Sequence, residues 1–344
     1  MEAGPELTDD LGHDERAIDD LLKSPAWRRK GPAEPRRLAR LYLEGFNAAE
    51  LSRASVLAIV DQQAAAERIS GDWLGRPTGG YGALPLRLVE KLSRIDPQRG
   101  RSWLRLGVVV TRVAWQPGRV TVHAHAPDGT RLPPVKARAA VVSVPLGVLQ
   151  ARPPALGALV FAPGLPPPVR QALDGLAMGA VTKVVLRLNR SPWRGRAAPI
   201  GFVHVPAAPF PTFWSATDGP RPIIVAWAGG PAADRLHGLG ELRLRAAATS
   251  TLARAFGWTH REFLRLVDGV LVRTWADDPF ARGAYSYVKV GHRAAGRLLA
   301  APIAGTLFLS GEATDVKGWS GTVHGALESG ARVARDVVTA LRTG

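Results

Sequence analysis

The sequence predicts an α/β protein whose two domains interleave along the chain. Three observations favour this fold class. An apolar segment at residues 306–310 leads through a glycine-acid turn into a long helical pattern, residues 102–148 alternate like strands, and residues 181–275 mix strand-like with helix-like segments. With 344 residues and 46% hydrophobic content, the chain can bury a core large enough for two domains.

The segment near the C-terminus carries the clearest chemical signal. Residues 306–310 have the length and composition of a core strand, Gly311 and Glu312 follow in a turn, and Gly321 opens the predicted helix. Glu312 can accept hydrogen bonds from ligand hydroxyl groups, and the free N–H groups of a helix N-terminus stabilise negative charge. This segment therefore predicts a site for an electron-rich ring with a polyol tail. The helix has apolar-face residues at helical spacing: Val323, Ala326, Leu327, Gly330, Ala334, Val337 and Leu341.

The first quarter of the chain reads mainly as helices. Residues 36–46 and 54–68 have helical apolar spacing, and prolines between positions 25 and 35 mark a break before them. A further helix is predicted over residues 84–92. The glycine-rich turn at residues 79–82 caps this helix, because no β-branched strand precedes it.

Strand patterns follow this helical region. Apolar residues alternate over 104–110, residues 120–125 read as one arm of a hairpin, and Asp128 with Gly129 marks a turn. Residues 140–144 form a continuous apolar run, which is typical of a strand buried on both faces.

A proline-dense stretch at residues 153–168 marks a crossing between the two domains. Beyond it, strand-like and helix-like segments alternate, which is consistent with a sheet that covers a substrate cavity. The strands are predicted at 181–188, 200–205 and 223–227, and the helices at 241–256 and 261–266.

The formal net charge of +16 raises the question of nucleic-acid binding. The distribution of the charge argues against it, because only seven of the 45 basic residues are lysine and the arginines are scattered singly, apart from short runs at 28–30 and 36–37. Arginine here reads as the generic surface cation of the chain. The acidic first 22 residues are expected to lie near some of this charge.

Composition excludes several other classes. The absence of cysteine excludes disulfides and thiolate metal sites, and the eight histidines show no H-E-x-x-H spacing, so no metal site is predicted. No apolar run reaches the roughly 18 residues that a membrane-spanning helix needs, and the N-terminus is acidic where a signal peptide would be basic. We therefore expect a cytoplasmic protein without a membrane partner.

Four ordered blocks resemble the flavin-containing amine oxidase family, which includes monoamine oxidases, polyamine oxidases and lysine-specific histone demethylases. The resemblance covers roughly residues 79–341, and residues 43–47 look like bacterial members. The blocks are AVVSVPLGVL at 140–149, MGAVTKVVL at 178–186, DPFARGAYSY at 278–287, and GEAT with GTVHGAL at 311–314 and 321–327.

The resemblance implies a two-domain fold with an incomplete, Rossmann-like FAD-binding domain and a substrate domain of mixed sheet and helices. Ala284 stands where some monoamine oxidases attach the flavin through cysteine, so the FAD would be non-covalent. The implied division is a helical part of the substrate domain at 1–78, an FAD-domain segment at 79–152, the substrate-domain sheet and helices at 153–280, and the C-terminal FAD-domain segment at 281–344.

Two residues are candidates for the reaction chemistry. By pattern alone, Lys183 could lie on a half-solvated strand face, and Tyr285 with Tyr287 could be core tyrosines. The resemblance implies that Lys183 holds a water against the flavin and that Tyr285 forms one wall of an aromatic cage for the substrate amine. The second wall would fall on Thr322, which leaves a wider site, as in polyamine oxidases and histone demethylases.

The resemblance also implies a set of cofactor contacts. Each has a plainer reading, as a turn carboxylate, a packed helix start, a strand residue or a domain-interface tryptophan. The implied cofactor-binding residues are Val110, Trp275, Gly311, Glu312, Gly321, Thr322 and Val323.

The family normally begins with a strand, a G-x-G-x-x-G turn and a helix that hold the FAD pyrophosphate, and this sequence contains no such motif. Two functions therefore stay open. One is an FAD-dependent oxidoreductase that converts an amine to an imine and reduces oxygen to hydrogen peroxide. The other is a truncated, non-catalytic chain that binds FAD weakly, or only with a partner chain that supplies the missing unit. A partner or a homodimer would then cover the exposed sheet edge.

Overall fold

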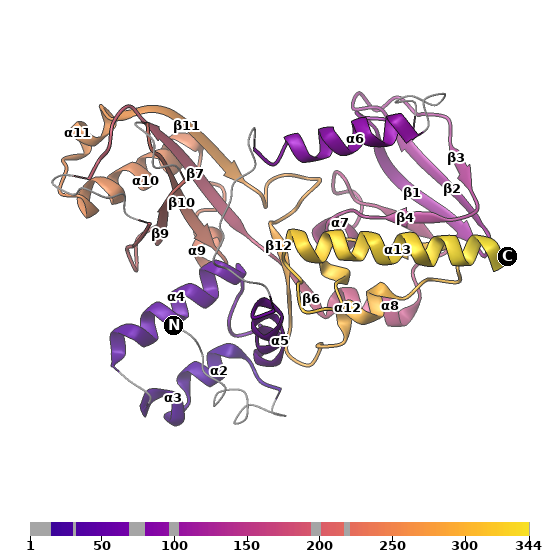
Figure 1. The fold of residues 1–344 in the computed structure, drawn as a ribbon, viewed down its shortest axis with the longest axis horizontal. Coiled ribbons are helices and arrows are strands. Elements are labelled where there is room, and N and C mark those ends of the chain that lie inside the picture. Colours follow the sequence, from indigo (N-terminus) through magenta and orange to yellow (C-terminus); the bar gives the residue numbers. More distant parts are fainter. Residues whose placement is uncertain are drawn as a thin grey trace.

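A computed structural model describes residues 15–29, 32–68, 80–95, 103–193, 201–216 and 221–343. The elements separate into two halves in Figure 1, with a long antiparallel sheet in one half and shorter sheets with the C-terminal helix in the other. The N-terminal helices lie beside the first half, near its border with the second. Residues 73–79 and most of the acidic N-terminal segment, for which the sequence makes predictions, lie outside the described residues.

The first half is a five-stranded sheet in which each strand runs antiparallel to its neighbours. The sequence predicts β7, β8, β10 and both longer helices, but not β9 or β11. In sheet order the strands are β11 (Val267–Thr274), β7 (Val181–Leu188), β10 (Ile223–Gly229), β9 (Thr212–Ser215) and β8 (Phe202–His204). The helices are α9 (Pro231–Asp234), α10 (Glu241–Ala255) and α11 (His260–Leu264).

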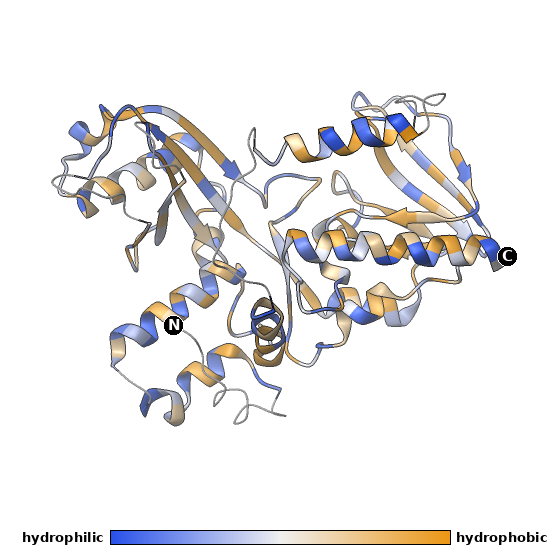
Figure 2. Ribbon diagram, viewed as in Figure 1, coloured by the Kyte–Doolittle hydropathy of each residue, from blue (hydrophilic) through white to orange (hydrophobic). Residues whose placement is uncertain are grey.

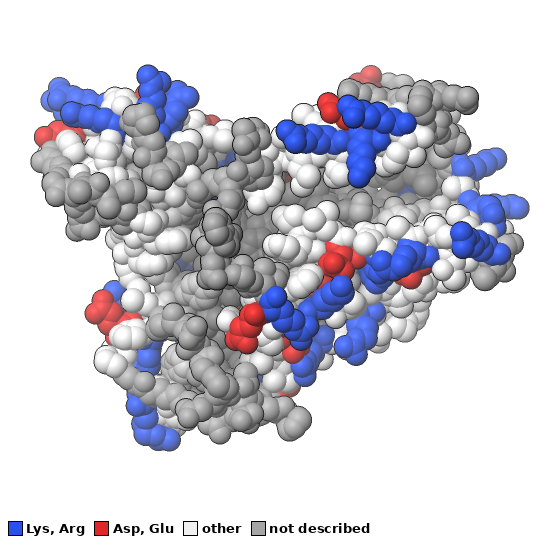
Figure 3. All heavy atoms as spheres, viewed as in Figure 1, with Lys and Arg blue, Asp and Glu red and all other residues white. Residues whose placement is uncertain are grey.

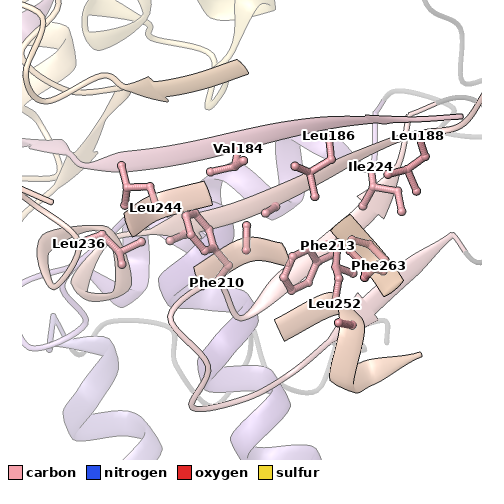
Figure 4. Packing of buried hydrophobic residues seen from close by; sticks show 14 of the residues in the cluster. Val184, Leu186, Leu188, Phe210, Phe213, Ile224, Leu236, Leu244, Leu252 and Phe263 are labelled. Atoms are coloured by element: carbon pink, nitrogen blue, oxygen red, sulfur yellow. The ribbon is translucent and has the colours of Figure 1, made fainter. Parts of the chain in front are cut away.

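One face of this sheet is closed by the helices. Alternate β7 residues Val184, Leu186 and Leu188 are completely buried, as the period-two pattern predicts. Figure 4 shows their side chains packed with Phe213 and Leu252, which belong to β9 and α10. The start of α11 is fixed by a reciprocal capping box between Thr259 and Glu262. This half has a closed core of its own.

The second half contains a four-stranded sheet in the order β3-β2-β1-β5. The predicted hairpin is confirmed, with a tight turn at Gly118 and a second turn at Asp128 and Gly129. The predicted alternation over 104–110 is wrong in its first part, because the strand begins only at Val109 and Leu106 is 82% exposed. The strands are β1 (Val109–Gln116), β2 (Arg119–His125), β3 (Val135–Ala137) and β5 (Val160–Ala162).

A separate two-stranded parallel sheet joins β4 (Ala140–Val142) to β13 (Leu307–Leu309). All three residues of β13 are buried, as expected for a core strand. The expectation that the strand at 140–144 is buried on both faces is wrong, because Val141 is 49% exposed. Val142 is buried, so β4 is covered on one face only by the described part of the chain.

Further elements surround these strands, and α7, α8, β6 and α12 share their core. This core contains Leu159, Leu173 and Leu176 together with Val113 and Leu307. The domain division expected from the sequence stays a prediction. The elements are α6 (Ala83–Ile95), α7 (Leu146–Gln150), α8 (Pro167–Asp174), β6 (Leu176–Gly179), β12 (Tyr285–Val288), α12 (Ala295–Ala300), the 3-10 turn η1 (Glu312–Thr314) and α13 (Val323–Thr343).

The N-terminal helices connect the two halves. A third apolar cluster joins Ile18 and Val56 to Tyr287 of β12. On the surface, Arg293 makes a two-point ion pair with Asp61 at 2.6 Å. The helices are α2 (Ile18–Lys23), α3 (Pro25–Arg29), α4 (Ala33–Asn47) and α5 (Val56–Ala66), which confirms the predicted helical region and its proline-marked break.

Two kinds of feature are absent from the described residues. None of the helices there is both long and apolar enough to cross a bilayer. Within the same residues, histidine, aspartate and glutamate side chains form no group of three or more suited to a metal ion.

Candidate active site

Glu312 lies at the centre of the candidate site, in the turn between β13 and α13. One carboxylate oxygen accepts a hydrogen bond from the backbone N–H of Ser286 at 2.9 Å. The other accepts from the Ser286 hydroxyl at 2.7 Å and from the N–H of Gly321 at 2.7 Å. The carboxylate therefore ties β12 to the turn before α13, and its expected contact with a ligand hydroxyl stays a prediction.

Tyr285 precedes Ser286 on β12 and is fixed by this tie. Its hydroxyl donates a 2.5 Å hydrogen bond to the carbonyl of Phe46, at the C-terminal end of α4. Burial raises the pKa of Tyr285 above its ordinary value. The phenol is thus a neutral donor with a fixed ring orientation, whereas Tyr287, two residues on, packs into the third apolar cluster.

Gly321 brings the turn against Tyr285. Its φ of +75° lies in the left-handed region, and a Cβ at this position would stand 3.4 Å from the tyrosine ring. The positive φ is the reason that glycine is favoured here, since the space beside the ring would admit a methyl group. The backbone before α13 therefore passes close to the tyrosine ring.

The first turn of α13 is open. Thr322 and Val323 are exposed, and the Thr322 hydroxyl donates to the carbonyl of Trp319 at 2.7 Å and accepts from the N–H of Gly325 at 3.1 Å. The leading N–H groups of a helix have no acceptor within the helix. The Thr322 hydroxyl therefore caps the Gly325 amide, while the exposed residues Thr322 and Val323 leave the start of the helix accessible.

Lys183 approaches this region from the five-stranded sheet. It lies on β7 opposite Trp227 of β10 and Arg273 of β11, on the face away from the closed core. The Trp227 indole donates a 2.9 Å hydrogen bond to the carbonyl of Gly45 on α4. Gly45 precedes Phe46, so two consecutive carbonyls at the end of α4 hold Trp227 and Tyr285.

This end of α4 approaches the sheet very closely. A Cβ on Gly229 would collide with the Gly45 carbonyl, so glycine is required where the helix meets β10. Farther along the face, the rings of Trp214 and Trp227 lie 5.5 Å apart. The aromatic face that carries Lys183 is therefore linked by hydrogen bonds through α4 to Tyr285.

The other predicted cofactor residues do not take part in the hydrogen bonds that connect Trp227 and Tyr285 to the end of α4. Trp275 follows β11, is 41% exposed, and its carbonyl accepts from the N–H of Gly283 at 3.0 Å. Val110 lies on β1 in the four-stranded sheet, a different sheet from those of Lys183 and Tyr285. Gly311 has a φ of +125°, and its N–H donates to the Ser329 hydroxyl on α13 at 2.9 Å.

Sequence reasoning missed the groups that assemble the site. Ser286, Gly45, Phe46 and Trp227 act through side-chain or backbone partners that are far away in the sequence. The position of Ser286 directly after Tyr285 was the one available signal. The backbone carbonyls of α4 carry no sequence signal.

A separate groove of about 430 Å³ lies between α7, β5 and α8. Its lining includes Arg152, Arg170 and Gln150, but none of the predicted site residues. The Gln150 amide already donates to the carbonyls of Leu173 and Leu176, at 2.7 and 3.1 Å. This groove therefore belongs to the packing of the second half and not to the candidate site.

The residues present fit one end of FAD. Tyr285 offers an aromatic wall, and the exposed start of α13 offers a helix N-terminus, which suit the flat ring and its carbonyl oxygens. They do not fit the other end, because the sequence has no G-x-G-x-x-G turn for the pyrophosphate. The described residues thus offer contacts suited to the ring, and the sequence offers no such turn for the phosphates.

The fold is similar to that of flavin-containing amine oxidases. The family model for flavin-containing amine oxidoreductases matches residues 13–338. The chain belongs to that family.

Several relatives are similar to this chain. Polyamine oxidase 1 of Oryza sativa is 29% identical over 313 residues, which cover 77% of this chain and 57% of the relative. Lysine-specific histone demethylase 1 homolog 1 of the same species is 30% identical over 207 residues, which cover 58% of this chain and 23% of the relative. The chain thus spans little more than half of one curated relative and about a quarter of the other.

Solved structures share the fold at lower identity. Wild-type putrescine oxidase bound to putrescine aligns with a TM-score of 0.73 and 21% identity, covering 98% of this chain and 70% of the other. Cyclohexylamine oxidase from Brevibacterium oxydans aligns with a TM-score of 0.71 and 19% identity, covering 99% of this chain and 70% of the other. The α/β amine oxidase-like fold expected from the sequence is confirmed.

Proposed function

We propose that the chain carries the amine-binding and ring-contacting parts of an FAD-dependent oxidoreductase. The reaction would oxidise the C–N bond of a monoamine or polyamine to an imine, with oxygen reduced to hydrogen peroxide. Non-covalent FAD, when bound, supplies the redox chemistry. The observation that carries the proposal is the set of hydrogen bonds from Ser286 and Gly321 to Glu312, which keeps the neighbouring Tyr285 close to the backbone that leads into α13.

Tyr285 would position the substrate. Its hydroxyl is committed to the Phe46 carbonyl, so its ring is held in one orientation and can present a face to the amine. Tyr42 and Phe46 of α4 stack at 5.1 Å, and both side chains are exposed. This aromatic surface would contact the apolar body of the amine and fix the carbon that loses hydrogen.

Lys183 would act on oxygen or water. Lys183 is paired with Trp227 across the strands, and from this position its ammonium group could hold a water molecule or stabilise negative charge on reduced oxygen. No dedicated base is needed if the amine arrives deprotonated.

A second candidate function follows from the incomplete phosphate end. Each charge-assisted hydrogen bond to the pyrophosphate is worth about 1.5–3 kcal/mol, so the loss of several weakens FAD binding by orders of magnitude. The chain would then be non-catalytic alone, binding FAD weakly or only with a partner that supplies the missing unit.

The first experiment records the visible absorption spectrum of the purified chain before and after incubation with FAD, followed by an assay of amine-dependent peroxide release. Bound flavin together with peroxide release supports the oxidoreductase. Protein that stays colourless rejects it for the isolated chain and favours the second candidate.

Two variants test the assigned roles when flavin binds. Lys183→Met should slow reoxidation by oxygen, whereas Lys136→Met, which changes an exposed lysine on β3, should not. Tyr285→Ala should impair amine turnover. Unchanged kinetics in either site variant would remove the role assigned to that residue.

A further inference from the structure

The sheet face that carries Lys183 also carries a row of aromatic side chains. This aromatic row consists of Phe202 and His204 on β8, Trp214 on β9 and Trp227 on β10. Strand residues adjacent to them, such as Phe213, belong to the closed core, and successive strand side chains point to opposite faces. The aromatic row therefore lies on the face away from that core.

The rings of the aromatic row lie close to one another. The ring centroids of Phe202 and His204 are 6.3 Å apart, those of Phe202 and Trp214 are 6.4 Å apart, and those of Trp214 and Trp227 are 5.5 Å apart. Phe202 and His204 are exposed, and the two tryptophans are partly buried. A patch of aromatic side chains that stays open to solvent is suited to binding an apolar or aromatic group.

The aromatic row reaches the candidate site through α4. The Trp227 indole donates to the carbonyl of Gly45, and the next carbonyl, that of Phe46, accepts from the Tyr285 hydroxyl. Tyr42 and Phe46 stack on the same helix and are exposed. Trp227 and Tyr285 thus meet the same end of α4, so that one extended molecule can contact both.

The free charges beside the aromatic row are positive. Lys183 lies next to Trp227 in the register and opposite Arg273, and neither makes an ion pair with a described residue. Figure 2 shows β11 ending in a hydrophilic segment, which contains Arg273, and Figure 3 shows an uncharged area of surface near β9 and α4.

The carboxylate on the described part of this sheet face is already paired. Asp268 accepts a 2.7 Å hydrogen bond from Arg187, at the far end of β7. A second ammonium group on a ligand would therefore meet two cations and no free acid among the described residues of the face. Like charges brought together in this way oppose binding.

We propose that the aromatic row selects a monoamine with a single large aromatic or long alkyl body, and that Lys183 and Arg273 disfavour polyamines. The proposal rests on the proposed function, because it names the substrate class of the same site. The nitrogen lies near Tyr285, and the body displaces water from the rings of Trp227 and Trp214.

Isothermal titration of the full chain without added flavin compares two pairs of amines at neutral pH. Octylamine and 1,8-diaminooctane differ in the second nitrogen, and octylamine should bind at least about 10-fold more tightly. Butylamine and 4-phenylbutylamine differ in the ring, and the phenyl compound should bind at least about 10-fold more tightly. Tighter or equal binding of the diamine, as cation–π contacts of its second ammonium group would give, overturns the proposal.

Two variants test the residues named. Trp214→Ala should weaken binding of 4-phenylbutylamine about 10-fold and leave butylamine unchanged, because it removes the middle ring. Its control is Trp103→Ala, at an exposed tryptophan outside the sheet, which should leave both affinities unchanged. Wild-type binding by Trp214→Ala would overturn the role of the aromatic row.

Arg273→Asp replaces an exposed cation on the sheet face by a carboxylate. It should shift the ratio of octylamine to diamine affinity at least about 10-fold toward the diamine. Arg297→Asp makes the same change of charge at an exposed position on α12 and should leave the ratio unchanged. Circular dichroism should show that each variant folds, and an unchanged ratio in Arg273→Asp would overturn the exclusion of polyamines.

An assay of peroxide release with flavin added separates this proposal from the proposed function. If the preferred monoamines bind but no peroxide is released, the proposed function fails and the aromatic row remains an amine-binding surface. If peroxide is released with the diamine in preference to octylamine, the function stands and the selection of monoamines is wrong.

Discussion

The two halves of the molecule bury their apolar residues to different extents. In the five-stranded sheet, Leu186 of β7 and Leu252 of α10 are completely buried in one core. In the other half, Leu88 of α6 and Leu327 of α13 belong to apolar stripes at helical spacing and remain exposed. The difference teaches that a periodic apolar stripe does not by itself determine burial, which depends on what the rest of the fold packs against it.

The largest expected effect lies in the closed half. Phe213→Ala removes a completely buried ring from β9 and should lower the free energy of unfolding by about 3–5 kcal/mol. Urea denaturation followed by tryptophan fluorescence measures the change. Phe202→Ala is the control on neighbouring β8, because Phe202 is 65% exposed. Equal losses for both variants would show that the sheet core is not closed as described.

The next largest effect is expected at Glu312, whose hydrogen bonds join β12 to the turn before α13. Glu312→Gln keeps the shape of the side chain but removes the charge that three donors share, so it should cost about 1.5–3 kcal/mol. Hydrogen exchange at the amides of Ser286 and Gly321 should accelerate. Glu328→Gln breaks an exposed ion pair with Lys317 and should cost less than about 1 kcal/mol. Unchanged exchange at both amides would mean that the tie does not hold the turn.

A smaller, pH-dependent effect is expected at Tyr285. Tyr285→Phe removes the hydrogen bond to Phe46 and should lower the free energy of unfolding by about 1 kcal/mol near neutral pH. Because burial raises the folded-state pKa of Tyr285, its stabilising contribution is present below pH about 10, where unfolded tyrosine titrates, and is lost as the pH rises further. Urea denaturation at a series of pH values should show the deficit of the variant shrinking above that point. A constant deficit would contradict the assigned burial.

The smallest effect is expected on the exposed face of α6. Leu88→Ala should change the free energy of unfolding of the isolated chain by less than about 0.5 kcal/mol, because the Leu88 side chain is already exposed to solvent. Leu252→Ala in α10 should cost about 2–5 kcal/mol by comparison. Thermal unfolding of both variants gives the comparison directly. A loss above 1 kcal/mol for Leu88→Ala would show that α6 is packed in the free chain.

Sequence reasoning recovered the elements that depend on local pattern. The β7 alternation, the hairpin of β1 and β2, and the long helix α13 follow from periodicity and turn residues. It failed for Leu106 and Val141, whose apolar character predicted burial. Burial is decided by distant chain segments, which local patterns do not specify.

Some residues of the candidate site were identified from the sequence and others were not. Tyr285, Glu312 and Gly321 were found from sequence blocks, while the Phe46 and Gly45 carbonyls that hold Tyr285 and Trp227 were not. Carbonyl groups occur at every residue, so only their position in space makes them specific. Trp275 and Val110 stay predictions as cofactor contacts.

The sequence by itself determined the α/β class and the elements with a regular pattern, because these depend on periodicity and on local composition. The residues proposed for amine chemistry came from the resemblance to the family. Only the tertiary structure decided that Glu312 joins β12 to α13 and that the apolar faces of α6 and α13 point outward. The physical reason is that hydrogen-bond pairing and burial are properties of the space between segments, and each segment specifies just one side of the contact.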